Sequence, residues 1–330
     1  MWKFLIRRIL LGLLIIVLGA LVVYTVIRCL PASYVEKMAR QLTAGSNGRL
    51  SYKEILEKLN EQYGMNDPVP VGFAKWLFNA IQGNFGNSWK YMERPVTDVF
   101  AGSIGWSVLM NVITFIVEII VCIPLGILAA RKQYSKTDYA ITVFALACIS
   151  LPSFYLATVL KYVFSVKLGW LPLYGLTGDT YNTLGVMGKV GDIAKHLILP
   201  VITLSMLSIG GLTRYTRTNM LEVLNADYIR TARAKGLSEK KVINKHAFRN
   251  TLIPLVSYLS YLLPSMFGGA LITEQIFMIP GIGLKAYDAM ISGDIPFAMF
   301  YTTFMMVLTQ VSLIIADIMY AVVDPRVRVN

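Results

Sequence analysis

Residues 106–130 read WSVLMNVITFIVEIIVCIPLGILAA, an apolar run in which Glu118 is the single charged residue. An α-helix rises 1.5 Å per residue, so about 20 such residues cross the roughly 30 Å hydrocarbon core of a bilayer. Five further stretches of similar character lie near residues 9–30, 139–164, 196–216, 253–273 and 297–321. The sequence therefore predicts an all-α integral membrane protein with six transmembrane helices.

The composition of the whole chain supports this prediction. Hydrophobic residues make up 55% of the 330 residues and charged residues only 15%, whereas soluble domains carry about 25% charged residues. The three cysteines lie within or beside apolar runs, which favours buried small side chains over a disulfide scaffold or a metal site. The net charge of +12 could indicate a nucleic-acid ligand. However, basic residues beside apolar spans orient membrane proteins, so we expect no nucleic-acid partner.

The distribution of lysine and arginine predicts the orientation of the chain. Positive charge collects at the amino terminus, after the second span, in the tail (Arg326 and Arg328) and between the fourth and fifth spans, where nine basic residues lie between Arg214 and Arg249. The positive-inside rule then places both termini in the cytoplasm. The predicted parts are an amino-terminal anchor (1–30), an extracytoplasmic cap (31–105), a five-helix core (106–321) with a basic loop at about 218–252, and a cytoplasmic tail (322–330).

Three of these parts carry further signals. The first span exceeds the 7–15 apolar residues of a signal peptide, which favours an uncleaved anchor. In the cap, residues 51–63 repeat Ile55, Leu56 and Leu59 at helical spacing. The cap is expected to be a small helical domain, and a docking surface for a substrate-carrying protein is compatible with that. The fourth span is rich in small and hydroxyl residues, which predicts contact with protein or a pathway instead of lipid.

The basic loop contains a predicted short helix at 225–236, NADYIRTARAKG. Asn225 or Asp227 is expected to cap its start, and Gly236 to end it in the left-handed conformation. Two turns of isolated helix are marginal in water, so the helix is expected to dock on something. Another protein and an anionic lipid surface are the two alternatives.

This loop resembles the coupling motif of ABC importer permeases, whose general form is Glu-Ala-Ala, three residues, then Gly. Arg230, Thr231 and Ala232 occupy the leading positions here, and Gly236 the glycine. The Arg in place of Glu, and the distance from Gly236 to Pro254, resemble the dipeptide/oligopeptide branch, B type. The segments that share this resemblance are DYIRTARAKGLSEKKV, HAFRNTLIP, YGMNDPVP, IQGNFGNSW, IPLGILAA, SLPSFYLA, LGWLPLYG, EQIFMIPGIG and DPRVR.

The resemblance implies a type I importer (MetI-like) transmembrane domain in a bacterial or archaeal cytoplasmic membrane. It implies a heterodimer with a homologous permease, two ATPase subunits that bind ATP-Mg, an extracytoplasmic substrate-binding protein and surrounding lipid, with no cofactor on this chain. The implied cargo is di- and oligopeptides, with a nickel complex as an alternative. The candidates for contact with the ATPase are Tyr228, Arg230, Thr231, Ala232, Arg233, Lys235, Gly236 and Leu237.

Glu118 and the segment FMIPGIG are candidates for the pathway. A carboxyl group near the centre of a span is a functional candidate or a buried hydrogen-bonding group. Pro280, Gly281 and Gly283 interrupt the helical pattern, and we expect them to help form an outer gate. An ion-coupled secondary transporter would need an internal repeat around a midplane ion site, for which one carboxylate is little support. With two histidines and neither an HExxH, a GxSxG nor a Walker A pattern, the chain is not expected to be an enzyme.

Overall fold

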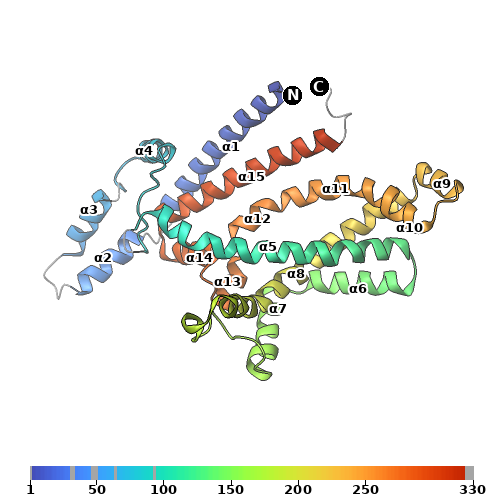
Figure 1. Ribbon diagram of the computed structural model, residues 1–330. Coiled ribbons are helices and arrows are strands. Elements are labelled where there is room, and N and C mark those ends of the chain that lie inside the picture. Colours follow the sequence, from blue (N-terminus) through green and yellow to red (C-terminus); the bar gives the residue numbers. More distant parts are fainter. Residues whose placement is uncertain (1, 30–33, 46–50, 63–64, 92–93, 324–330) are drawn as a thin grey trace. The chain divides into compact units, whose positions relative to one another are not determined.

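The computed structural model describes residues 2–29, 34–45, 51–62, 65–91 and 94–323. Among them the secondary structure is helical apart from one isolated bridge between Asn87 and Pro95 (Figure 1). Most of the predicted tail, including Arg326 and Arg328, lies outside the described residues. In chain order the elements are α1 (Trp2–Arg28), α2 (Tyr34–Gly45), α3 (Tyr52–Gln62), α4 (Val69–Ile81), α5 (Val96–Arg131), α6 (Lys136–Ser150), α7 (Ser153–Lys161), the π-helix η1 (Tyr162–Lys167), the 3₁₀-helix η2 (Tyr181–Thr183), α8 (Val186–Leu224), α9 (Asp227–Ala234), α10 (Glu239–Lys241), the π-helix η3 (Val242–Ala247), α11 (Phe248–Tyr261), α12 (Leu263–Gly268), α13 (Leu271–Phe277), α14 (Ile282–Ser292) and α15 (Ile295–Val323).

Four helices are long and apolar enough to cross a membrane, namely Ile6–Arg28, Val96–Arg131, Val186–Leu224 and Ile295–Ile318. Two further apolar helix pairs are broken, so the described chain has up to six spans if each pair counts as one. The prediction of an all-helical membrane protein is thereby confirmed. The second, fourth and sixth predicted spans fall inside α5, α8 and α15, and the first, 9–30, coincides with α1 as far as Arg28.

The other two predicted spans are not straight helices. The third, 139–164, breaks at Leu151 and Pro152, where the axis turns by 98° between residues 136–150 and 153–167. Proline lacks an N–H and restricts the residue before it, and Leu151 has an extended conformation with ψ 127°. The fifth, 253–273, is divided among α11, α12 and α13. Gly269 lies in one of these breaks with φ +77°, which favours glycine.

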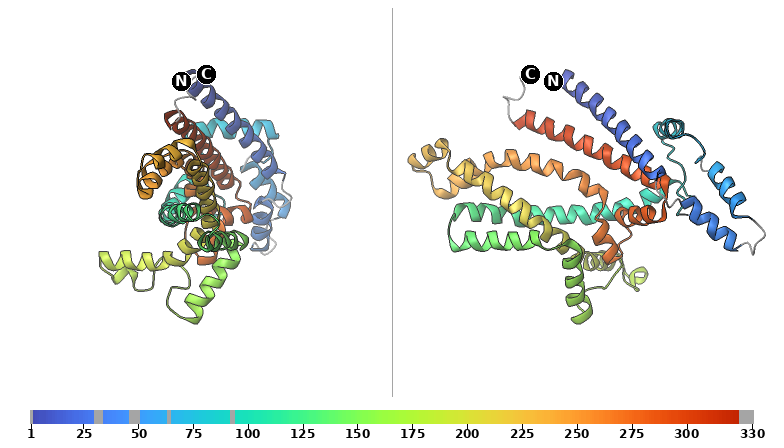
Figure 2. Two further views of the ribbon diagram at one scale, coloured as in Figure 1. Left: turned by 90° about the vertical axis from the view of Figure 1, so that its right-hand side faces the viewer. Right: turned by 180° about the vertical axis from the view of Figure 1, so that it is seen from behind.

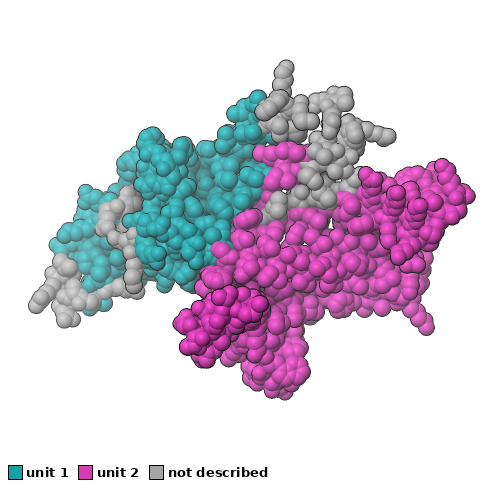
Figure 3. Space-filling model, viewed as in Figure 1, with its two compact units in different colours: residues 1–104, 285–311 teal, residues 105–284, 312–330 magenta. Residues whose placement is uncertain are grey.

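The chain forms two compact units (Figure 3). The first comprises residues 1–104 and 285–311. Its core joins side chains of α1, α2, α3, α4 and α15, among them Tyr24, Val35, Ile55, Phe73 and Met299. Ile55 and Leu59 of α3 are buried on one face, which confirms the predicted helix over Tyr52–Gln62; residue 63 lies outside the described residues.

The second unit comprises residues 105–284 and 312–330. Its central element is α8, which packs against α6, α7, α11 and α13. The membrane-crossing part of α8 is 61% buried, compared with 17–28% for the other three long spans. A Cβ at Gly210 would collide with Ile149 and with the Ala145 carbonyl of α6. The prediction that small residues bring this span against protein is therefore confirmed.

Candidate functional site

Helix α9 lies at one end of the second unit, where α8 ends and η3 and α11 begin (Figures 1 and 2). The predicted helix at 225–236 is confirmed, but its predicted cap is wrong. Ala226 occupies the N-cap position, and no side chain caps the helix. Asn225 instead ends α8, and Asp227 is the first residue of α9, where its carboxylate still favours the helix dipole.

One face of α9 packs on its own chain. Ile229 and Ala232 are buried in a cluster with Met220 of α8 and with Val242 and Ile243 of η3. The two α9 residues are three apart, so they lie on the same side of the helix. Among the predicted contact residues, Ala232 therefore belongs to this internal base, and Leu237 packs partly buried against it. Burial of this base compensates for the marginal stability of so short a helix.

The opposite face of α9 is exposed. Arg230 and Thr231 lie on it, Tyr228 lies at its edge and Lys235 follows the helix; all four are exposed, and the Arg230 side chain is 72% exposed. Arg230 lies 3.6 Å from Asp227 on the same helix, an exposed pair that contributes little to stability. The face is therefore a small basic surface with one aromatic side chain.

Arg233 has a different environment from Arg230. Its guanidinium donates two hydrogen bonds to Glu239, from Nε at 3.2 Å and from Nη2 at 2.8 Å. These hydrogen bonds lower the pKa of the Glu239 carboxyl and raise the pKa of Arg233. The contact connects α9 to α10 across the turn at Gly236, so Arg233 fixes the helix to its own chain.

Gly236 adopts φ +74°, which confirms the predicted left-handed end of the helix. No atom outside its neighbours lies within 4 Å of the position where a Cβ would stand. The requirement for glycine here is therefore conformational, since space is available.

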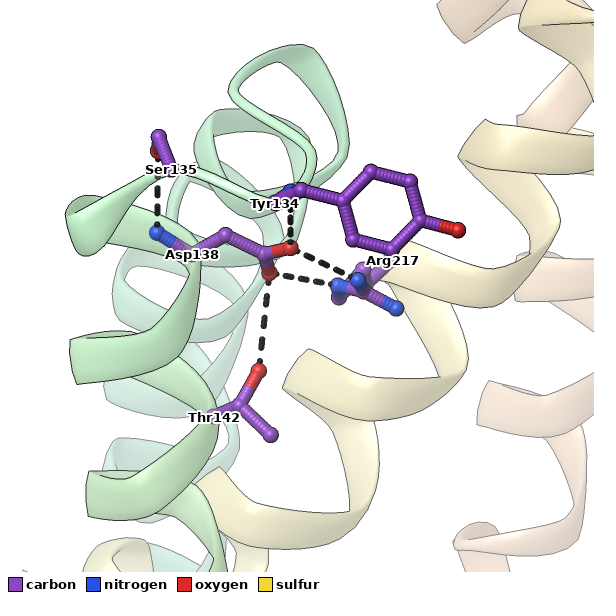
Figure 4. Close-up of polar contacts among 5 residues, drawn as sticks. All are labelled: Tyr134, Ser135, Asp138, Thr142 and Arg217. Atoms are coloured by element: carbon purple, nitrogen blue, oxygen red, sulfur yellow. Dashed lines mark hydrogen bonds and ion pairs between the residues drawn. The ribbon is translucent and has the colours of Figure 1, made fainter.

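A polar cluster that sequence reasoning missed ties α6 to α8 (Figure 4). Arg217 donates from Nε and Nη2 to the two carboxylate oxygens of Asp138, both at 2.7 Å. Asp138 also accepts the Tyr134 backbone N–H at 3.0 Å and contacts the Thr142 hydroxyl at 3.5 Å. Asp138 is buried and its bonding is bidentate, which makes this one of the stronger kinds of ion pair.

Glu118 is buried on α5 and lines a cavity of about 220 Å³ in the second unit. The lining combines Glu118 with polar Asn111, Thr114 and Ser208 and with apolar side chains such as Leu204. Ser208 of α8 faces the same cavity as the Glu118 carboxyl group. Both interpretations of Glu118, a pathway group and a buried hydrogen-bonding group, agree with this placement.

Two of the predicted gate residues, Gly281 and Gly283, lie against a different carboxyl group, that of Glu274. Glu274 is fully buried and accepts three hydrogen bonds, from Ser107 Oγ at 2.6 Å, Ala270 N at 3.1 Å and Leu284 N at 2.9 Å. Ser107 in turn accepts the Ile282 N–H at 2.7 Å. We call Ser107, Glu274 and the three N–H groups the Glu274 clasp.

The glycines of the gate segment make room for this clasp. A Cβ at Gly281 would lie 2.5 Å from Glu274 and Ser107, and one at Gly283 would lie 2.9 Å from Glu274 Oε2. Pro280 is exposed beside them, outside the clasp. The segment is thus a tightly bonded turn, and whether it also gates a pathway stays a prediction.

Comparison with known proteins gives the same picture along the whole chain. Residues 122–329 match the family described as binding-protein-dependent transport system inner membrane component. Residues 1–121 match its amino-terminal membrane component. The oligopeptide transport system permease protein AppB of Bacillus subtilis is 42% identical over 272 residues, covering 82% of this chain and 84% of that protein. OppB of Haemophilus influenzae, with the same description, is 33% identical over 83% of this chain and 86% of its own length. A putative peptide permease protein of Brucella ovis is 32% identical over the full length of both chains.

Long apolar helices, broken spans and a short projecting helix define a multi-pass α-helical protein of the cytoplasmic membrane, of the permease class. The chain belongs to the family of binding-protein-dependent transport system inner membrane components.

Proposed function

We propose that this chain is one permease subunit of an ABC importer that carries di- and oligopeptides across the cytoplasmic membrane. The names of the similar AppB and OppB proteins support the peptide cargo. A cargo such as a nickel complex remains the second candidate, because the 220 Å³ cavity at Glu118 offers one carboxyl group and no recognition pattern specific for peptides.

The observation that carries the proposal is the two-sided arrangement of α9. Its buried base, Ile229 and Ala232, connects it to α8 and η3, while Tyr228 and Arg230 remain free to contact another protein. A helix held in this way can pass a force from a partner to the membrane helices. The partner we propose is an ATPase subunit, which would bind ATP-Mg and drive the transport cycle.

The remaining parts of the proposal follow from the family and the charge pattern. A family that depends on a binding protein supports an extracytoplasmic partner that delivers the cargo. We further propose a homologous permease as the second half of the pathway, and both termini in the cytoplasm, on the side of α9. Nine basic residues between Arg214 and Arg249 support that orientation.

Reconstitution tests the coupling role directly. The chain is coexpressed with its sister permease and ATPase subunits, purified, and placed in liposomes with the binding protein. Arg230→Glu combined with Tyr228→Ala is expected to weaken ATPase association and reduce both ATP hydrolysis and peptide uptake. Lys195→Glu, an exposed charge reversal at the opposite end of α8, is the matched control and should leave all three unchanged.

Two results would overturn the proposal. One is normal assembly and uptake by the double variant. The other is accumulation of solute against a gradient by the single chain in liposomes with no other subunit. Replacing peptide by a nickel complex in the same uptake measurement separates the two candidate cargoes.

A further inference from the structure

Helix α4 presents three different faces along its 13 residues. Gly72 and Phe73 are buried against the rest of the first unit. A polar, exposed face carries Lys75 and Asn79 and continues into the C-cap residue Gln82. The third face is an apolar stripe that is also exposed; it consists of Val71, Ala74, Phe78 and Ile81.

The apolar stripe is continuous and strongly exposed. Its members are spaced by three, four and three residues, so at 3.6 residues per turn they fall within an arc of about 80°. Phe78 is 67% exposed and Ile81 is 79% exposed. A stripe of this kind on a helix that already has a buried face calls for a second apolar environment.

The position of α4 indicates what that environment is. The Phe73 ring packs 5.7 Å from the ring of Tyr24, in the last turns of α1. Arg28, the last residue of α1, donates to the carbonyl of Met65 just before α4. A Cβ at Gly72 would collide with the Tyr24 hydroxyl. Because α1 is a membrane-crossing helix, its last turn marks the depth at which the span leaves the hydrocarbon, and α4 is attached there.

The other residues of α4 fit that depth. Trp76 stacks 5.9 Å from Phe73, and Lys75 pairs with Asp67 at 2.8 Å on the polar side. Aromatic and basic residues gather at the level of lipid headgroups. At 13 residues the helix is about 20 Å long, too short to cross the bilayer. Val22 and Val26, in the same turns of α1 as Tyr24 and Arg28 but on the opposite face, are exposed apolar side chains, as expected where α1 still meets lipid.

We propose that α4 is an interfacial helix whose Val71–Ile81 stripe inserts into the lipid bilayer beside the end of α1. The occupant of the stripe is thus membrane lipid. The inserted helix anchors the first unit at the membrane surface. This proposal does not depend on the identity of the cargo or on the proposed contact with an ATPase. The proposal places α4 in the outer leaflet, and that choice of leaflet alone rests on the orientation proposed above.

Spin labelling tests the insertion in the assembled transporter. Exposed Cys29 is replaced by Ser, while Cys122 and Cys148 are buried. Single cysteines are then introduced as Phe78→Cys and Ile81→Cys, with Asn79→Cys and Gln82→Cys as matched controls from the polar face of the same helix. The labelled complexes are reconstituted in vesicles of phosphatidylethanolamine and phosphatidylglycerol. Collisions of each nitroxide with oxygen and with a water-soluble nickel chelate are measured.

The labels at positions 78 and 81 are expected to collide with oxygen and to be shielded from the nickel chelate, at a depth of about 5–10 Å below the headgroups. The labels at 79 and 82 should remain accessible to the chelate. Equal access of the chelate to both faces would show that the stripe faces water and would overturn the proposal. Shielding of positions 78 and 81 from both reagents would show a protein contact there and would overturn it equally. All four positions are exposed, so the labels leave the fold intact.

Discussion

Removal of the Glu274 carboxyl group tests the clasp most directly. Glu274→Ala leaves the Ala270 and Leu284 N–H groups without their acceptor inside the protein. A buried unsatisfied donor costs about 1–3 kcal/mol, so the two together cost about 2–6 kcal/mol. Glu274→Gln keeps one oxygen, which can still serve Ser107 and Ala270, and orphans only the Leu284 N–H. We expect it to cost about 1–3 kcal/mol.

The free energy of unfolding is measured by titrating the purified chain in mixed micelles with dodecyl sulfate, read by tryptophan fluorescence. The expected order of destabilisation is Glu274→Ala, then Glu274→Gln, then the control Glu222→Ala, which removes an exposed carboxylate from α8. Hydrogen exchange provides the local readout, since the amides of Ala270, Ile282 and Leu284 should exchange faster in the Ala variant. If both Glu274 variants match the control in stability and in exchange, the clasp does not hold this turn and the reasoning is refuted.

Four further changes probe the other contacts. Gly236→Ala forces a side chain into φ +74° at about 1–2 kcal/mol and should reduce ATP-driven uptake, with Gly236→Asn milder and Gly236→Pro most severe. Uptake that is equal in all three would contradict the turn's role. Arg217→Ala orphans a buried carboxylate and should cost about 3 kcal/mol of unfolding free energy, whereas Arg217→Lys should cost less. Hydrogen bonding to Arg233 of α9 lowers the pKa of Glu239 from its usual value of 4.5. The stability from this contact is therefore fully present at pH values above 4.5 and is lost as the pH falls through the pKa of the folded state. Glu239→Gln should therefore lower the protection of the α9 amides against hydrogen exchange at pH 7, and unchanged protection would count against the contact. Gly281→Ala, with its Cβ 2.5 Å from the clasp, should destabilise by about 1–3 kcal/mol, while Gly102→Ala in open space should not.

Hydropathy and helical period were enough to predict most of the architecture. The helices α1, α5, α8 and α15 could be predicted because a run of about 20 mostly apolar residues is typical of a membrane-crossing helix. The amphipathic spacing of Ile55 and Leu59 likewise gave α3. The same signals failed where backbone geometry changes inside an apolar run. The stretch 139–164 is mostly apolar on both sides of the break, so the bend at Leu151 and Pro152 depends on proline, whose effect hydropathy does not register.

The location of the candidate site was predicted from the sequence, but its hydrogen bonds and ion pairs were not. The motif predicted the positions of α9 and Gly236, but it did not predict which side chains of α9 make contacts within the chain and which are exposed. Arg233 looks equivalent to Arg230 in sequence, and its bond to Glu239 appears only once the turn is folded. Ser107 and Glu274 are 167 residues apart, and Asp138 and Arg217 are 79 apart. Such pairs leave no local periodic signal, because the contact is made by tertiary packing alone.

The uninterrupted length of α8 has a mechanical consequence. Its 39 residues make a rod of about 58 Å, nearly twice the thickness of the hydrocarbon layer. Tilting a rod of that length by about 5° around one end displaces the other by about 5 Å. Met220 packs against the base of α9, so if α9 binds the proposed ATPase, we expect a tilt of this size at the α9 end to move the other end of α8 by about one helical turn.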